Sequence, residues 1–282
     1  MSLSSASATA ETAFWDDAYS NSAYIPDGGA FPAKWAADAA AFRTAMTAAG
    51  RAKLDQPYGS RPRERFDLFL PTHTPEDVLI FVHGGYWTAF DKSSWSHLAA
   101  GALARGWAVA MPGYTLCPEV RISDITAEVA QAVTAIAEAI PGDLVLAGHS
   151  AGGHLVTRLA CADGPLPAAI RARVRHTVSI SGVHDLRPLL KTTMNETLRM
   201  DAAEAARESP ALLMPAPSAK VTCWVGSRER PEFIRQNALL ANIWTGLGAR
   251  IAERQAKGRH HYDVIDDLAD PGSALAGLLL DV

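Results

Sequence analysis

The sequence predicts an α/β fold built on a mainly parallel sheet that helices cover on both faces. Short apolar, β-branched segments alternate along the chain with longer helical segments, which is the order expected of such a sheet. One short segment, 78–82, is apolar at every position, as expected of a central strand buried on both sides. A chain of 282 residues is long enough to bury the large core that this architecture needs.

The elements are expected at the following places. We expect strands over 65–70, 78–83, 107–112, 144–148, 177–181, 221–225 and 250–255. We expect helices over 96–105, 125–140, 151–161, 231–247 and 263–280. Segment 65–70 alternates charged and apolar residues, which favours an exposed antiparallel strand at the edge of the sheet.

Residues 13–282 are expected to form a single domain after a disordered tail over 1–12, whose residues are small and polar. Residues 13–55 are rich in aromatic side chains before the sheet begins, which indicates an N-terminal cap segment. Residues 190–218 form an irregular insertion between two strands, where a lid could sit. Each segment is as consistent with ordinary loop packing as with the border of a functional site.

Composition and charge exclude several classes of protein. The formal net charge is −4 and no stripe of Lys and Arg is present, so we expect no nucleic-acid partner. No apolar segment approaches the length of a membrane span, and residues 1–33 lack the basic start of a secretory signal, so we expect a cytoplasmic protein with no membrane partner. The three cysteines are far apart and lack metal-ligand spacing, which favours buried free thiols: Cys117, Cys161 and Cys223.

Ser150 is the candidate nucleophile. It lies in the sequence GHSAG over 148–152, between an expected strand and an expected helix. A sharp turn in this context lifts a serine to an exposed, strained position at the end of a strand, and small neighbours tolerate the strain. His149 and His154 are expected to pack around this turn.

His261 is the candidate base, because a serine hydroxyl is weakly nucleophilic until a neighbouring base accepts its proton. In this architecture the base follows the last strand, and His261 follows the strand expected over 250–255. His260 is the adjacent competitor. We favour His261 because a bulky residue and then a helix start follow it.

The acid that orients the base is expected in the loop after the strand over 221–225. Glu229 lies in this loop, whereas Glu232 follows Pro231 and already belongs to the first turn of the next helix. Asp185, after the preceding strand, could orient the base instead. We favour Glu229 and keep Asp185 and Glu232 as alternatives.

The sequence HGGYW over 83–87 follows the strand expected over 78–83 and predicts an oxyanion hole. Gly84 and Gly85 let the backbone approach a substrate, and the Ala151 N–H at the start of a helix adds a further donor. Tyr86 and Trp87 are expected to line the substrate pocket, although large aromatic side chains often belong to the core.

The two motifs together resemble the α/β-hydrolase fold over most of the chain from about residue 58. More narrowly, the chain resembles serine-dependent kynurenine formamidases (arylformamidases), close to the hormone-sensitive-lipase-like esterases. The residues that carry the resemblance are HGGYW (83–87), GHSAGG (148–153), SGVHDL (181–186), PEF (231–233), HYD (261–263) and YSNSAYIP (19–26). The resemblance implies Ser150 as nucleophile and His261 as base, with Gly84 and Gly85 on the oxyanion loop. The acid of that group is usually Asp, and Glu229 stands at the matching place.

These observations predict a serine hydrolase that cleaves a small aryl formamide or a short-acyl ester through an acyl-enzyme. Such chemistry needs no metal or organic cofactor, and the neighbouring His260, His261 and Asp263 are poorly spaced for tetrahedral zinc. The alternatives are a general short-chain carboxylesterase and a non-catalytic member of the fold that binds a small ligand. We expect a small-molecule acyl substrate as the partner and leave a homodimer open.

Overall fold

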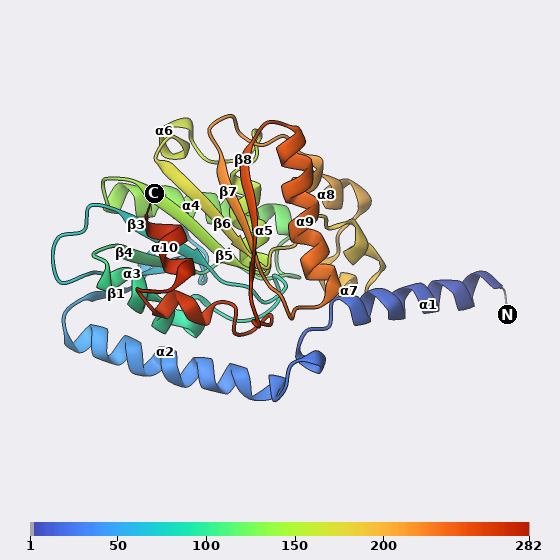
Figure 1. Cartoon of the computed structure of the whole chain (residues 1–282), viewed down its shortest axis with the longest axis horizontal. Coiled ribbons are helices and arrows are strands. Elements are labelled where there is room, and N and C mark those ends of the chain that lie inside the picture. The colour runs from blue at the N-terminus through green and yellow to red at the C-terminus, as the bar shows by residue number, and fades with distance from the viewer. Residues whose placement is uncertain (1–2, 282) are drawn as a thin grey trace.

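The structure is a computed structural model that describes residues 3–281, with side chains described from residue 9 onward. Its centre is an eight-stranded sheet in the order β1-β2-β4-β3-β5-β6-β7-β8 (Figure 1). β2 runs antiparallel to β1 and β4, and every other neighbouring pair is parallel. The strands are β1 Ala52–Pro57, β2 Arg65–Phe69, β3 Val78–Val82, β4 Ala108–Pro112, β5 Leu144–His149, β6 Val174–Ile180, β7 Lys220–Gly226 and β8 Arg250–Ala256. The expected mainly parallel sheet is therefore confirmed.

Alternate side chains of the central strands enter two separate cores, one on each face of the sheet. On β3, Val78, Ile80 and Val82 pack into one core, while Leu79 and Phe81 pack into the other. β3 lies between β4 and β5, as expected of a strand that is apolar at every position. This two-sided burial anchors the strand ends from which the functional loops start.

Helices cover both cores, as expected. The first core receives side chains from α4 (Ile122–Ala139), α5 (Ala151–Leu159) and α9 (Pro231–Gly246). The second receives side chains from α2 (Phe31–Ala48), α3 (Ala100–Ala104) and α10 (Ala274–Leu280). The short helices α6 (Ala168–Arg171), α7 (Asn195–Leu198) and α8 (Ala202–Arg207) lie in connections.

Three elements differ from those expected. The sequence does not predict β1, because this strand carries charged residues and ends in proline. The helix expected over 96–105 is a 3-10 segment, Lys92–Ala99, that is kinked at Trp95 and followed by α3. The helix expected over 263–280 is divided into a 3-10 segment, Asp266–Ala269, and α10, because Pro271 favours an extended conformation at the residue before it.

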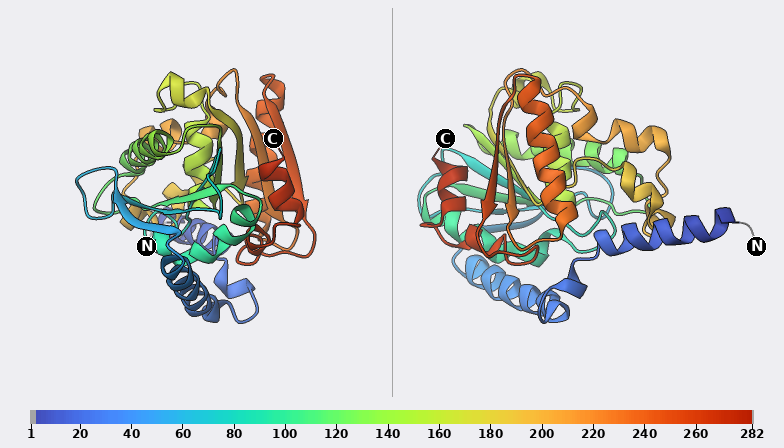
Figure 2. Two further views of the ribbon diagram at one scale, coloured as in Figure 1. Left: turned by 90° about the vertical axis from the view of Figure 1, so that its left-hand side faces the viewer. Right: turned by 45° about the vertical axis from the view of Figure 1, so that its right-hand side comes forward.

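The chain before the sheet forms two helices. α1 (Leu3–Ala18) projects from the body of the molecule, and α2 runs along it (Figure 2). Residues 3–12, which were expected to be disordered, are thus helical, and residues 1 and 2 lie outside the described part. Tyr19 and Trp35 are buried against the body, whereas residues 52–55 of the expected cap segment belong to the sheet as part of β1.

Each of the three cysteines is a buried free thiol, as expected. Over residues 3–281, no helix combines the length and apolarity needed to cross a bilayer. The cytoplasmic location stays a prediction.

Candidate active site

Ser150 lies at a strained turn between β5 and α5. Its backbone has φ +55° and ψ −116°, a conformation that costs about 1–3 kcal/mol in a residue with a side chain. The turn is held by backbone hydrogen bonds from Ser150 N to Ile180 O and from His154 N to Ser150 O. A Cβ on Gly152 would lie 2.0 Å from Val82 O, so the turn packs against β3 too closely for any side chain there. The small residues around Ser150 are therefore a steric requirement.

Glu229 and His261 form a buried pair at the ends of β7 and β8. His261 Nδ1 lies 2.6 Å from Glu229 Oε2, and both side chains are less than a tenth exposed. The other oxygen, Oε1, accepts hydrogen bonds from Gly226 N at 2.8 Å and Ser181 Oγ at 2.5 Å. A carboxylate held by these donors faces Nδ1, which places the ring proton there and leaves Nε2 able to accept a proton.

The alternative acids and the alternative base are engaged elsewhere. Asp185 holds the guanidinium of Arg187 through both carboxylate oxygens. Glu232 accepts hydrogen bonds from Tyr19, Arg235 and Gln236. His260 Nδ1 accepts backbone N–H groups of its own loop, at 3.2 Å from Tyr262 N and Asp263 N.

The His261 ring is held between two other rings. The Phe233 ring lies 4.4 Å away and the His149 ring 4.7 Å away, centre to centre. His149 Nε2 lies 2.9 Å from the carbonyl oxygen of His261, to which it donates. Burial, reinforced by the nearby His261, lowers the pKa of His149 well below its ordinary value, so this ring stays neutral beside the pair. His149 therefore positions the loop that carries His261.

The loop after β3 lies directly against Ser150. A Cβ on Gly84 would meet Ser150 Cβ at 3.0 Å, and Gly85 has φ +109°. His83 Nδ1 lies 2.7 Å from Gly84 O, and Tyr114 Oη donates to His83 O at 2.9 Å. The C=O and N–H of a trans peptide point in opposite directions. The bond to His83 O therefore turns the Gly84 N–H away from Tyr114, and the bond to Gly84 O turns the Gly85 N–H away from the His83 ring. Burial lowers the pKa of His83 to about 4, so its ring is neutral at neutral pH.

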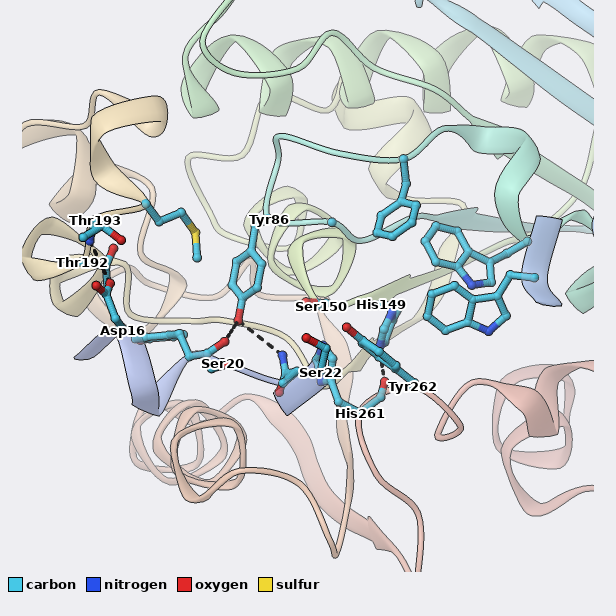
Figure 3. Close-up of a pocket in the computed structure, with 17 residues that line it drawn as sticks. Asp16, Ser20, Ser22, Tyr86, His149, Ser150, Thr192, Thr193, His261 and Tyr262 are labelled. Atoms are coloured by element: carbon cyan, nitrogen blue, oxygen red, sulfur yellow. Dashed lines mark hydrogen bonds between the residues drawn. The ribbon is translucent and has the colours of Figure 1, made fainter. Parts of the chain in front are cut away.

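Ser150, His261 and Gly85 line one cavity of about 460 Å³ (Figure 3). Both segments for which a place at the border of the site was left open contribute to the wall of this cavity. Residues Asp16, Tyr19, Ser20, Asn21, Ser22 and Trp35 come from the chain before the sheet, and Thr192, Thr193 and Met194 come from the insertion between β6 and β7.

Tyr86 lines this cavity, but Trp87 does not. Trp87 is fully buried in the core, where its ring packs edge-on against His154 at 5.2 Å. Both residues have positive φ, at +49° and +59°, so the loop winds in a left-handed turn that directs the two side chains differently. The expectation that Trp87 lines the pocket is wrong.

In the described part of the chain, the Ser150 hydroxyl and His261 are not hydrogen-bonded to each other. Catalytic hydrogen bonds are commonly long before a substrate binds. Over residues 3–281, no group of three or more His, Cys, Asp or Glu side chains is arranged to hold a metal ion.

Several residues around the site were not singled out from the sequence. Ser181 holds Glu229, and its position directly after β6 is the signal that could have indicated it. His83 was part of a recognised motif without an assigned role. The sequence pointed to the two segments as a cap and an insertion, but it did not indicate which of their residues line the cavity, because that depends on long-range packing.

Comparisons with known proteins agree with the fold. The model of the alpha/beta hydrolase family matches residues 79–280. The chain belongs to the alpha/beta hydrolase family. A solved structure, a candidate thioesterase from Silicibacter sp., is 53% identical to this hydrolase, with a TM-score of 0.89 over 94% of this chain and 98% of that one.

Curated relatives of this hydrolase include kynurenine formamidases. The protein from Danio rerio is 29% identical over 236 residues, which cover 80% of each chain. The protein from Drosophila melanogaster is 25% identical over 234 residues, 78% of each chain. The resemblance expected from the sequence is confirmed, and the chain is a hydrolase of the formamidase or esterase type.

Proposed function

We propose that this hydrolase cleaves small aryl formamides or short-acyl esters through a covalent acyl-enzyme on Ser150. The observation that carries the proposal is the buried pair of Glu229 and His261, because His261 lines the same cavity as the strained Ser150. In the proposed roles Ser150 is the nucleophile, His261 the base and Glu229 the acid that orients it.

In the first half of the reaction, Ser150 Oγ attacks the carbonyl carbon while His261 Nε2 takes the hydroxyl proton. The charge that develops on the carbonyl oxygen is stabilised by the N–H groups of Gly84, Gly85 and Ala151. One such donor contributes about 3 kcal/mol to the stability of the transition state. The C–N or C–O bond then breaks, and His261 returns its proton to the departing amine or alcohol.

In the second half, His261 takes a proton from water and the resulting hydroxide attacks the acyl carbon of the ester on Ser150. The Ser150 oxygen leaves and recovers its proton from His261, so the enzyme is regenerated. For a formamide, the products are the free aryl amine and formate. Glu229 stabilises the imidazolium form of His261 in both halves.

Cavity size and lining support a small aromatic substrate. A cavity of about 460 Å³ is in the range of small-molecule sites. Trp35, Phe90, Trp95 and Tyr262 lie together in its wall and offer flat faces for an aryl ring. The proposal is also supported by the two curated relatives described above, which are named kynurenine formamidases.

Two measurements test the proposal. A fluorophosphonate probe should label the intact protein once and should not label Ser150→Ala. kcat/KM should then be compared for N-formylkynurenine, a neutral formanilide, 4-nitrophenyl acetate and 4-nitrophenyl butyrate. Equal labelling of Ser150→Ala would contradict the acyl-enzyme, and tight ligand binding without turnover of any substrate would favour a non-catalytic member of the fold.

A thioester is the second candidate substrate, because the 53% identical structure from Silicibacter sp. is a candidate thioesterase. The same acyl-enzyme would form, with a thiol as the leaving group. An acetyl thioester of an aryl thiol, assayed beside the neutral formanilide, separates the two. A kcat/KM at least tenfold higher for the thioester would favour this candidate.

A further inference from the structure

The cavity around Ser150 has two chemically different ends. One end is aromatic: the rings of Trp35, Phe90 and Trp95 lie 5.0–6.1 Å from one another, and a Cβ on Gly85 would meet the Phe90 ring. At the other end the wall is polar apart from Met194, and it comes from α1, the residues that follow α1 and the insertion between β6 and β7. Figure 3 shows Asp16 and Thr193 on one side of Tyr86 and Ser150 on the other.

Asp16 is the charged residue of the polar end. The hydroxyl side chains of Ser20, Thr192 and Thr193 line the same end of the cavity. The described lining contains no Lys or Arg. Asp16 Oδ1 accepts the backbone N–H of Thr193 at 2.8 Å, which fixes the carboxylate at the cavity wall. Asp16 also lies in the last turn of α1, a turn without a basic residue, where the helix dipole adds negative potential.

Three cations of the described neighbouring segments are paired with other carboxylates. Lys191 lies 2.5 Å from Glu11, and Arg230 lies 2.5 Å from Asp17. Shortly before the insertion, Arg187 binds both oxygens of Asp185.

The histidines of the lining do not supply a cation for the substrate either. His149 is neutral because burial lowers its pKa well below the ordinary value. His261 is paired with Glu229. A substrate carboxylate in the cavity would therefore be desolvated without a positive partner, which is costly.

We propose that this cavity selects acyl substrates without a carboxylate, and prefers those whose leaving group ends in an ammonium that pairs with Asp16. The proposal rests on the proposed function, because it places the aryl ring beside the aromatic wall and the ammonium at Asp16. It also separates this hydrolase from an enzyme adapted to a free amino acid, since an amino acid brings a carboxylate beside its ammonium.

Four substrates test the preference. All are 2-(formylamino)phenyl ketones, and the ketone side chain ends in a methyl group, an ammonium, a carboxylate or an α-amino acid, the last being N-formylkynurenine. We expect kcat/KM to be about fivefold higher for the ammonium than for the methyl compound, the size of a solvated ion pair. We expect it to be about tenfold or more lower for the carboxylate, because like charges are brought together. The amino acid should fall below the methyl compound.

Asp16→Asn should reduce the ratio of kcat/KM for the ammonium and methyl compounds to near one. Asp27→Asn is the matched control: it removes the same charge from an exposed residue of the same N-terminal segment that does not line the cavity, and it should retain the ratio within about twofold. In the unaltered enzyme, raising the salt concentration from about 0.05 to 0.5 M should reduce the ratio as well, so the test does not depend on a variant that folds.

Equal or faster turnover of the carboxylate or amino-acid compound overturns the proposal, and so does a ratio that neither Asp16→Asn nor salt reduces. If the methyl compound is hydrolysed in these cases, the proposed function stands and only the charge preference fails. If none of the four is hydrolysed while Ser150 still takes up the fluorophosphonate, the formamide assignment itself fails.

Discussion

Replacing Glu229 with glutamine tests the geometry of the site most directly. Glu229 Oε1 accepts the N–H of Gly226, a donor that cannot reverse its role, so the amide oxygen of a glutamine must take this place. The amide NH₂ would then face His261 Nδ1, where Oε2 now lies at 2.6 Å. Two donors cannot share a hydrogen bond, so His261 would move its proton to Nε2.

A histidine that carries its proton on Nε2 cannot accept one from Ser150. The corresponding change in a serine protease triad lowers kcat about 10⁴-fold with little change of structure, and we expect a loss of that order here. This corresponds to about 5 kcal/mol in the activation barrier. The assay is kcat and KM on a neutral formanilide, with thermal unfolding measured on the same preparation. KM should change little, because Glu229 does not touch the substrate.

Two further variants serve as controls for this result. Asp185→Asn removes the carboxylate that binds Arg187 and should retain kcat within about threefold. Glu229→Asp retains the charge but shortens the arm that reaches His261, so kcat should lie between those of the unaltered enzyme and Glu229→Gln. A Glu229→Gln protein with kcat within tenfold of the unaltered enzyme, or a larger loss in Asp185→Asn, would refute the assignment of the acid.

Three further predictions concern the oxyanion loop, the turn at Ser150 and stability in acid. His83→Phe retains a ring that stacks on Tyr114 but loses the hydrogen bond to Gly84 O. We expect kcat to fall about a hundredfold with KM nearly constant. An unchanged kcat would contradict the role of His83 in orienting the oxyanion loop. Gly152→Ala places a Cβ 2.0 Å from Val82 O and should lower the free energy of unfolding by about 3 kcal/mol or more. Gly246→Ala is the control, because its Cβ would lie in open space and should not lower the free energy of unfolding. Urea unfolding of both variants measures the difference. Burial lowers the pKa of four histidines from 6.5 to about 4 or 3: His83, His154, His176 and His184. Below pH 6.5 the unfolded chain therefore binds more protons than the folded one, and the free energy of unfolding decreases as the pH falls from 6.5 towards 4, by up to about 1.4 kcal/mol per pH unit for each histidine. Equal free energies of unfolding at pH 7 and pH 5 would contradict this prediction.

The parts of the site that depend on local chain geometry could be predicted from the sequence. The turn at Ser150 and the loop at Gly84 each follow an apolar strand and need glycine for close approach, and both requirements are visible in the residues themselves. Glu229 and His261 could be placed by their positions after the last two strands, because parallel strands end at the same edge of a sheet.

The walls of the cavity could not be predicted in this way. Tyr19 lies in the wall because its hydroxyl donates to Glu232, 213 residues further along the chain, and no local pattern indicates such a contact. The sequence motif assigns Tyr86 and Trp87 to the pocket together, but with positive φ angles at both residues the Trp87 side chain lies in the core. Backbone twist of this kind is set by tertiary packing.

The two loops that carry Glu229 and His261, the proposed acid and base, are bound to each other by backbone hydrogen bonds. Ser227 N and Arg228 N donate to Ala256 O and Arg259 O, each at 2.9 Å, and these bonds continue the pairing of β7 and β8 beyond the ends of the strands. A Cβ on Gly226 would lie 2.3 Å from Arg259 O, so the two backbones are in close contact. The distance between acid and base is thus fixed by backbone hydrogen bonds of the sheet. The polar end of the cavity comes from segments outside this pair of loops, so we expect variants of Asp16 to change the proposed charge selection without disturbing the proposed proton transfer at Ser150.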